Sequence, residues 1–558
     1  MLTKNLENFS NIQLKNRLLN MSLDDTKKGV SFCVTPSNDY VLLKDDVPID
    51  DIENPKLAVQ KHLKSNIKSE MKSNDKIVVF GIGLGYLLDE VFNEYPSKIF
   101  LYEPDVELLH FVLNNVDISE HLSSGRVYVS CDMDDIITKL SESYISKDKI
   151  EIVYLQNYAI VKNQEMLLLT QKVFDACKSK MVDINTITKF SQRWLDNTLN
   201  NVANINKPDV EVSLLSDLEN KFLGQTALIA GAGPSLNDNI SNIQKNRNKF
   251  VIFAVNKSVP FLTQNGIYPD FVVCLDAGNM QKTLDVPDEY IARMNCIFDI
   301  RTDKTIFNKK FKKMFVEFSD SDTVSRKMAT YNKSMNFYET GGSASTLAFV
   351  SAVKLGFSKI ILAGIDLAFK ENVIYANGEI MKMTTPDEIV VDGVRKPIVK
   401  VPSVSGGVVS TREDYQAFIQ HFETLIKDLA PIEVYNISSF GANIKGAKNV
   451  HFESIVLSML SSMQAVNVVE PCKIDVENFI KDEFFNINNI ISILSKGVFS
   501  PALVSSIVKS VLIYQYMQAE IITVLQKNFE PQIADDFISK TKAAIKNVVD
   551  LMQSNKLI

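Results

Sequence analysis

The fold is decided by the stretch Thr226-Ala-Leu-Ile-Ala-Gly-Ala-Gly-Pro-Ser-Leu-Asn-Asp-Asn-Ile240. An apolar run leads into two glycines, a proline and a serine, and a helical pattern follows. This composition fits a tight strand-to-helix turn, because glycine tolerates positive φ and proline is favoured at the first position of a helix. It also fits a phosphate site, because a helix N-terminus presents unpaired N–H groups and a missing Cβ lets an anion approach. The stretch alone leaves both interpretations open.

Strand-like apolar runs recur through the middle of the chain, separated by helical or loop segments. This alternation predicts a mostly parallel, doubly wound sheet. The runs are 227–230, 251–255, 271–275, 296–300, 314–318 and 360–363.

A second, similar pattern lies nearer the N-terminus. The run Lys76–Phe80 precedes the turn Gly81-Ile-Gly-Leu-Gly85, and a second run, Lys98–Tyr102, ends at Glu103. A glycine-rich turn with an acidic residue after the next strand is the pattern of a nucleotide-binding Rossmann half. Residues before about 75 are predicted to be irregular, with short helical patterns only.

We therefore predict an α/β fold with two Rossmann-like doubly wound parallel-sheet domains and a C-terminal α-helical bundle. The predicted domains are residues 1–205, which end in a long connecting helix, residues 206–467, and residues 468–558. After about Val468 glycines nearly vanish and apolar residues recur every three or four positions, as amphipathic helices require.

Composition describes an ordinary globular protein. The 558 residues are 46% hydrophobic and 23% charged, and the net charge of -7 argues against nucleic acid as a partner. The six cysteines are far apart, so neither a metal site nor a disulfide framework is predicted. No apolar run is long enough to insert into a membrane, and we expect a soluble, cytoplasmic protein.

Polar residues follow several of the central strands. In an open parallel sheet, ligands lie beyond the carboxyl ends of the strands. The residues expected there are Gly231, Gly233, Pro234 and Ser235, then Asn256 and Lys257, Asp276, the turn Glu339-Thr340-Gly341-Gly342-Ser343, and Asp366. Two glycine-rich helix starts, an amide, a lysine and two carboxylates would together suit a phosphate-bearing ligand.

These motifs resemble those of the motility accessory factor (Maf) family. The central matches are 231–236, 267–276, 340–346 and 361–369, and the outer ones are 54–58, 80–86 and 444–446. The resemblance implies a bacterial glycosyltransferase that attaches nonulosonic acids, which are sialic-acid-like sugars, to flagellin. It covers essentially the whole chain.

The central domain of that family is similar to bacterial sialyltransferases that use CMP-activated sugars. This similarity gives Gly231, Gly233, Ser235 and Asn256 nucleotide-binding roles and places Asp366 near the cytidine. Tyr375 lies within one position of a phosphate-binding tyrosine of those enzymes, whereas Ala368 stands where they carry another. The donor would be a CMP-nonulosonic acid, with no separate cofactor and no metal.

The implied reaction transfers the sugar, pseudaminic or legionaminic in type, to a Ser or Thr hydroxyl of flagellin. Amides near Gly231 and Gly342, with Lys257 or Tyr375, would stabilise the departing phosphate. Glu339 is the preferred general base. We expect a structural role for His421, on a helix that the capping box Ser410-Thr-Arg-Glu413 introduces.

Other functions fit parts of the sequence. The first glycine turn with Glu103 would suit an S-adenosylmethionine-dependent methyltransferase, and archaeal relatives of the central domain transfer pyrophosphate to a pterin. A non-enzymatic flagellin-binding chaperone is a further alternative. The sequence leaves open the identity of the sugar and whether the chain forms a homo-oligomer.

Overall fold

The computed structural model describes residues 1–22, 29–67, 70–144, 148–278, 280–370, 375–376, 383–385, 388–391, 394–429, 431–460, 466, 469–496, 499–526 and 534–558. Two compact units form, one of Met1–Thr186 and one of nearly all the chain from Ile187 onward. The division falls inside α10 (Asn163–Ile205), the long connecting helix that the sequence predicts. Among the described residues, no helix is both long and apolar enough to cross a membrane.

The larger unit is built on a parallel sheet whose order explains where a ligand would bind. Its described strands run β14-β13-β12-β11-β10-β9-β15-β20-β21, with β14 at Phe337–Tyr338, β20 at Glu433–Asn436 and β21 at Lys448–Asn449. The chain starts at β9 (Thr226–Ala230), moves outward strand by strand to β13 (Lys313–Ser319), and returns to β15 (Lys359–Ala363) on the other side of β9. The order therefore reverses at β9 and β15, and loops after these two strands diverge to opposite faces.

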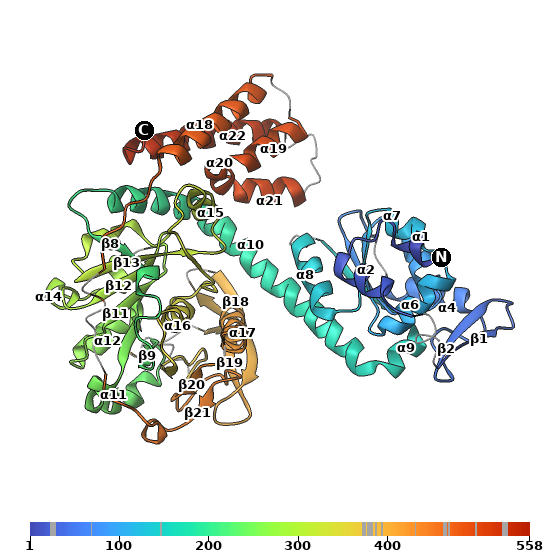
Figure 1. Cartoon of the computed structure of the whole chain (residues 1–558), viewed down its shortest axis with the longest axis horizontal. Helices are drawn as coiled ribbons and strands as arrows, with labels where there is room; N and C mark the ends of the chain where they lie inside the picture. The colour runs from blue at the N-terminus through green and yellow to red at the C-terminus, as the bar shows by residue number, and fades with distance from the viewer. Residues whose placement is uncertain are drawn as a thin grey trace. The chain divides into compact units, whose positions relative to one another are not determined.

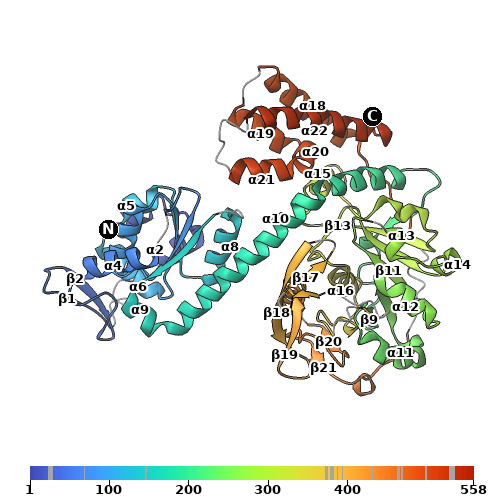
Figure 2. The ribbon, with the colours of Figure 1, turned by 180° about the vertical axis from the view of Figure 1, so that it is seen from behind.

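Helices cover both faces of this sheet, as predicted for a doubly wound fold. Figures 1 and 2 show α11 (Leu236–Lys245) and α12 (Val259–Gln264) on one face, and α16 (Ala344–Lys354) and α17 (Glu413–Asp428) on the other. Alternate strand residues supply two separate cores: Leu228 faces α11, and Ile229 faces α16. Burial on both faces explains the continuous apolar runs of these strands.

The predicted strands of this sheet are all present. The intervening strands are β10 (Val251–Val255), β11 (Phe271–Cys274) and β12 (Asn295–Asp299), each buried along its whole length. The C-terminal residues form α18 (Glu477–Leu494), α19 (Pro501–Lys509), α20 (Val511–Tyr516), α21 (Gln518–Gln526) and α22 (Ala534–Ser554). These helices share a core with the α11 face of the sheet, within the same compact unit. The three-part division of the chain stays a prediction.

The smaller unit contains the second Rossmann-like sheet. Its four parallel strands run β6-β5-β4-β7, with β4 at Lys76–Phe80, β5 at Lys98–Tyr102, β6 at Val127–Ser130 and β7 at Ile150–Tyr154. The expectation of irregular structure before residue 75 is wrong in part. Residues 30–48 form a small antiparallel sheet, and Asn54 caps α4 (Pro55–Asn66) with its side chain.

Two further details differ from the sequence prediction. An antiparallel sheet of β16 (Met383–Thr385), β17 (Glu388–Val391), β18 (Val394–Pro402) and β19 (Val408–Arg412) is inserted after β15. The predicted capping box is wrong, because Ser410 and Thr411 belong to β19 and pair with β18. Arg412 takes the N-cap position of α17 without a side-chain cap.

Candidate functional site

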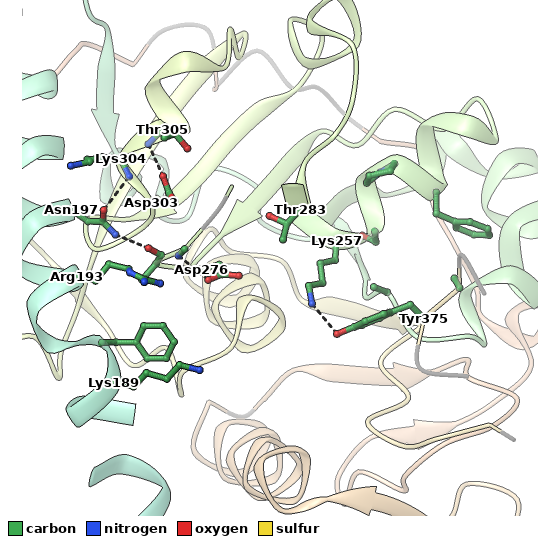
Figure 3. A pocket seen from close by; sticks show the side chains of 18 of the residues that line it. Lys189, Arg193, Asn197, Lys257, Asp276, Thr283, Asp303, Lys304, Thr305 and Tyr375 are labelled. Atoms are coloured by element: carbon green, nitrogen blue, oxygen red, sulfur yellow. Dashed lines mark hydrogen bonds between the residues drawn. The ribbon is translucent and has the colours of Figure 1, made fainter. Parts of the chain in front are cut away.

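A cavity of about 840 Å³ lies at the carboxyl ends of the central strands. The loops after β9, β10, β11 and β12 line it, together with Tyr375, Ala376 and one face of α10 (Figure 3). This is the edge at which open parallel sheets bind ligands, and the volume is typical of a small-molecule site. Four basic and three acidic side chains line the cavity: Lys189, Arg193, Lys257, Lys304, Asp196, Asp276 and Asp303.

Lys257 and Tyr375 form one side of this cavity. The Lys257 Nζ donates to the Tyr375 hydroxyl at 2.9 Å and lies 4.6 Å from the centre of the tyrosine ring. The two residues come from the β10 and β15 loops, and Figure 3 shows their side chains meeting. The structure thus joins two residues that the sequence placed 118 positions apart.

A second tyrosine and an arginine support Tyr375. Burial first, and then the Tyr375 hydroxyl, raise the pKa of Tyr415 well above its ordinary value. The Arg412 guanidinium lies 3.9 Å from the centre of the Tyr415 ring and donates to Asp414 at 2.8 Å. The positive charge of the Arg412 guanidinium therefore lies against Tyr415, which in turn interacts with Tyr375.

Asn256 and Asp276 lie in neighbouring loops. Asn256 is 5% exposed, and its amide donates to the Thr283 hydroxyl at 2.9 Å, which joins the β10 loop to a residue lining the cavity. Asp276 lines the cavity directly and accepts a hydrogen bond from the Gly278 amide at 3.0 Å. Asn256 therefore does not line the cavity itself but bonds to Thr283, which does.

Ser235 and Asp366 form a buried pair at the switch between β9 and β15. The Asp366 carboxylate accepts hydrogen bonds from the Ser235 amide, at 2.8 Å, and from the Ser235 hydroxyl. Both residues are at most 1% exposed. Burial raises the pKa of Asp366 to about 6, and the Ser235 bonds act in the opposite direction. In this structure the pair joins two loops and does not line the cavity.

Close packing against the β15 loop accounts for Gly231 and Gly233. A Cβ on Gly231 would lie 2.3 Å from the Gly364 carbonyl oxygen, and one on Gly233 would lie 2.6 Å from the Asp366 carboxylate. Neither of these two described glycines has a positive φ. Their neighbour Ala232 lines the cavity, and Pro234 precedes α11, which begins at Leu236 rather than at the proline.

The Glu339–Ser343 turn lies outside the residues that line the cavity. Ser343 caps α16 by accepting a hydrogen bond from the Thr346 amide at 3.1 Å, and the Thr340 carbonyl accepts one from the Thr346 hydroxyl. Gly341 and Gly342 have the positive φ values, 58° and 74°, that favour glycine. The turn therefore serves at least as the start of α16.

His421 packs against this turn, a contact that the sequence did not suggest. A Cβ on Gly341 would overlap the imidazole, at 1.8 Å from its Cδ2. The His421 Nδ1 lies 4.0 Å from a carboxylate oxygen of Glu339, whose side chain is 70% exposed. Burial lowers the pKa of His421 despite the nearby carboxylate.

The basic face of α10 is the main feature that the sequence analysis missed. Lys189, Arg193 and Asn197 line the cavity at intervals of four residues, so they share one helix face. The Asn197 amide donates to the carbonyls of Ala277, at 3.0 Å, and Arg301, at 2.9 Å. The spacing was visible in the sequence, but nothing local indicated which loops this face would meet.

The glycine turn of the smaller unit is filled by protein side chains. A Cβ on Gly81 would lie 2.7 Å from the Tyr158 ring, and one on Gly83 would lie 2.7 Å from the Asp50 carboxylate. Glu103 is fully buried and accepts hydrogen bonds from the Tyr158 hydroxyl, at 2.7 Å, and from the Ile82 and Asp105 amides. The carboxylate that would hold a ribose is therefore engaged within the protein.

The fold and cavity define a class: an α/β protein with two Rossmann-like sheets and a small-molecule site at the carboxyl edge of the larger one. Comparison with solved structures finds a protein of similar fold. The Maf glycosyltransferase from Magnetospirillum magneticum AMB-1 superposes with a TM-score of 0.65, over 100% of this chain and 96% of that one. The sequences are 15% identical, so the predicted resemblance is confirmed at the level of the fold.

Sequence comparison gives two further similarities. Residues 196–372 match the model of a family described as 6-hydroxymethylpterin diphosphokinase MptE-like, and this segment includes the β9 to β15 strands. An uncharacterized protein of Treponema pallidum (strain Nichols) is 29% identical over 125 residues, which are 22% of this chain. The match spans 56% of the length of that relative.

Proposed function

We propose that the chain is a glycosyltransferase that moves a nonulosonic acid from its CMP conjugate to Ser or Thr hydroxyls of flagellin. The shared fold with a Maf glycosyltransferase over the whole chain supports a glycosyltransferase, and the sequence motifs support the donor and acceptor. The single observation that carries the proposal is the cavity at the strand edge, where Lys257 and Tyr375 meet.

The chemistry of the reaction explains why these two residues matter. As the glycosidic bond breaks, negative charge grows on the CMP phosphate. A lysine ammonium and a tyrosine hydroxyl held together in advance would bind that phosphate more strongly as its charge grows, which lowers the barrier. The buried Ser235–Asp366 pair would act as a positioning pair that fixes the β9 loop beside them.

The general base in this proposal is Glu339. Its side chain is exposed, so an acceptor hydroxyl from another protein would reach it without displacing the core. His421, 4.0 Å away, would orient the carboxylate. The Thr340–Ser343 turn would offer amides of the α16 N-terminus to the nucleotide.

The test is intact mass of flagellin co-expressed with this protein in a host that makes nonulosonates. Wild-type protein is expected to add sugar increments, and Lys257→Met with Tyr375→Phe is expected to abolish them. Lys310→Met, a substitution of an exposed lysine outside the cavity, is the matched control. Sugar increments that persist in the double variant would rule out this site, and flagellin that is bound but never modified by wild-type protein would favour a chaperone.

A second candidate is pyrophosphate transfer to a pterin, which the description of the matched family favours. The same cationic cavity would then hold a nucleoside triphosphate. The two functions differ in cosubstrate: the diphosphokinase consumes ATP and needs no CMP-sugar. Formation of AMP from ATP with 6-hydroxymethylpterin, without any flagellin modification, would replace the first proposal with the second.

A further inference from the structure

The cavity has a second basic wall opposite the Lys257–Tyr375 pair. Figure 3 shows Lys189 and Arg193 entering from α10 on the side away from Lys257. Both side chains are exposed, and among the described residues neither forms an ion pair with a carboxylate. Lys304 on the same side differs, because it is paired with Asp196 at 2.8 Å.

The acidic side chains near this wall are already engaged. Asp276 accepts from the Gly278 amide at 3.0 Å, and Asp303 accepts from the Thr305 amide at 2.8 Å. Asp196 is held by Lys304. The pairing with Lys304 neutralises Asp196, so the α10 face of this wall carries the positive charges of Lys189 and Arg193, and the carboxylates of Asp276 and Asp303 lie on the loops beside it.

The structure fixes the segment of α10 that carries Arg193. Gly278 makes room for the Arg193 side chain, since a Cβ there would lie 2.8 Å from a guanidinium nitrogen. One and two turns further along α10, Asn197 and Asn201 donate to backbone carbonyls of the β11 and β12 loops at 2.7–3.0 Å. Asn201 is fully buried, so α10 cannot slide along the cavity without breaking these bonds.

The donor does not account for a second basic wall. In a CMP-nonulosonate the carboxylate and the phosphate are both attached to the anomeric carbon, so its negative charges lie together. The Lys257–Tyr375 side would take both. The wall across the cavity then faces the space beyond the sugar, from which the acceptor must approach.

We infer that Arg193 and Lys189 bind an acidic side chain of the acceptor polypeptide near the hydroxyl that is modified. This inference rests on the proposed function and names the recognition element of the same site. An acidic segment would be repelled by the chain as a whole, which has a net charge of -7, so a local basic wall is needed to draw it in. The planar guanidinium of Arg193 suits a carboxylate in a bidentate contact.

The test measures transfer by the full-length protein to purified, unmodified flagellin, with CMP-pseudaminic acid and CMP-legionaminic acid each tried as donor. In Arg193→Glu we expect the KM for flagellin to rise by about tenfold or more, because like charges now meet. The KM for the donor and the kcat should stay within about twofold of wild type. The flagellin KM of wild type should also rise with ionic strength, and that of Arg193→Glu should not.

Two controls separate recognition from misfolding. Lys310→Glu makes the same change of charge on the exposed surface and should leave both KM values unchanged. Arg193→Lys keeps the charge and should restore most of the affinity for flagellin. A flagellin variant with Lys in place of acidic residues beside the modified sites should recover transfer by Arg193→Glu.

The other possible results overturn either this inference or the proposed function. An unchanged flagellin KM in Arg193→Glu, or a rise confined to the donor KM, overturns the inference and leaves the proposed function standing. Failure of wild-type protein to transfer either sugar overturns the proposed function, and this inference with it.

Discussion

At the residue scale, the cavity depends on side chains that meet only through the fold. Lys257 and Tyr375 follow different strands, and the 2.9 Å hydrogen bond between them exists because β9 separates β10 from β15 by one strand. Ser235 and Asp366 meet for a similar reason, across adjacent strands. Both pairs of residues therefore lie at the point where the strand order reverses.

Replacing Lys257 by Met should remove the charge that, in the proposed reaction, stabilises the departing phosphate, while keeping the volume of the side chain. We expect kcat/KM for the donor to fall about 10²-fold, in the range found when one stabilising group of an active site is removed. Steady-state transfer to flagellin measures this. Thermal unfolding should stay near that of wild type, because Lys257 is exposed.

Replacing Glu339 by Gln tests the general base. Removing the base should lower kcat by about 10²-fold and leave the KM for the donor unchanged. Glu289→Gln, at an exposed position of the short helix α14 (Asp288–Ile291), provides the comparison. Equal kcat values for the two variants would assign proton removal to another group, with His421 the next to test.

At the element scale, the loop after β9 shows how packing and binding share the same residues. Gly231 and Gly233 are required because the β15 loop lies against them, and Ala232 between them lines the cavity. The glycine-rich motif therefore sets how closely two loops approach. If a ligand contacts the backbone of this loop, the packing against the β15 loop fixes the position of that contact.

Gly233→Ala should destabilise the larger unit by about 1–3 kcal/mol, the usual cost of overpacking, because the new Cβ would meet the Asp366 carboxylate and the Gly364 carbonyl. Gly224→Ala is a useful comparison. Its Cβ would have open space, so it should cost only about 1 kcal/mol for a positive φ. Denaturant unfolding of both variants measures the difference, and equal costs would show that the β9–β15 contact is loose.

The elements that the sequence predicted well are those whose own residues determine them. The strands from β9 to β15 are buried on both faces, so their apolar runs are continuous and bounded by turns. The 30–48 sheet was missed because β1 (Val30–Val34) is largely exposed and lacks such a run. The inserted β16–β19 sheet was missed as well, and Ser410-Thr-Arg-Glu413 resembled a helix cap although its first residues pair with β18.

Residues near the strand ends could be placed at the cavity from the sequence, and their roles there stay predictions. Lys257 and Asp276 line the cavity because each lies two positions after the end of a strand. The α10 wall depends on Asn197 and Asn201 bonding to loops about 80 to 104 residues away, which no local pattern encodes. The predicted roles of the Glu339–Ser343 turn stay predictions.

At the scale of the whole molecule, the two Rossmann-like sheets differ in what fills their first turn. In the larger unit the turn after β9 borders a cavity. In the smaller unit Tyr158 and Asp50 occupy the corresponding space, and Glu103 is buried among hydrogen bonds. This packing argues against a methyltransferase that binds S-adenosylmethionine at Glu103.

Asp50→Asn should change the pH dependence of the smaller unit alone. Burial raises the pKa of Asp50 to about 7 from 3.8, so the folded unit binds more protons than the unfolded chain between these values. The free energy of unfolding therefore falls as pH rises across that window and levels off above it. The Asp50→Asn variant lacks this loss. Between pH 4 and pH 8 its free energy of unfolding should therefore rise by on the order of 3 kcal/mol relative to that of wild type.

Calorimetry of the full chain at several pH values measures this effect. Because two compact units form, we expect two transitions, of which Asp50→Asn moves one. Glu120→Gln, at an exposed position of the same unit, should move neither with pH. A pH-independent difference between Asp50→Asn and wild type would mean that Asp50 is ionised in the folded protein.

The most direct test of the central claim is a crystal structure of the full chain with CMP bound. The phosphate should lie within hydrogen-bonding distance of the Lys257 Nζ or the Tyr375 hydroxyl, with the nucleoside in the cavity beyond the carboxyl ends of β9 and β10. Arg193 should remain clear of the nucleotide, on the opposite wall. CMP bound at another place on the chain, with this cavity unoccupied, would contradict the account.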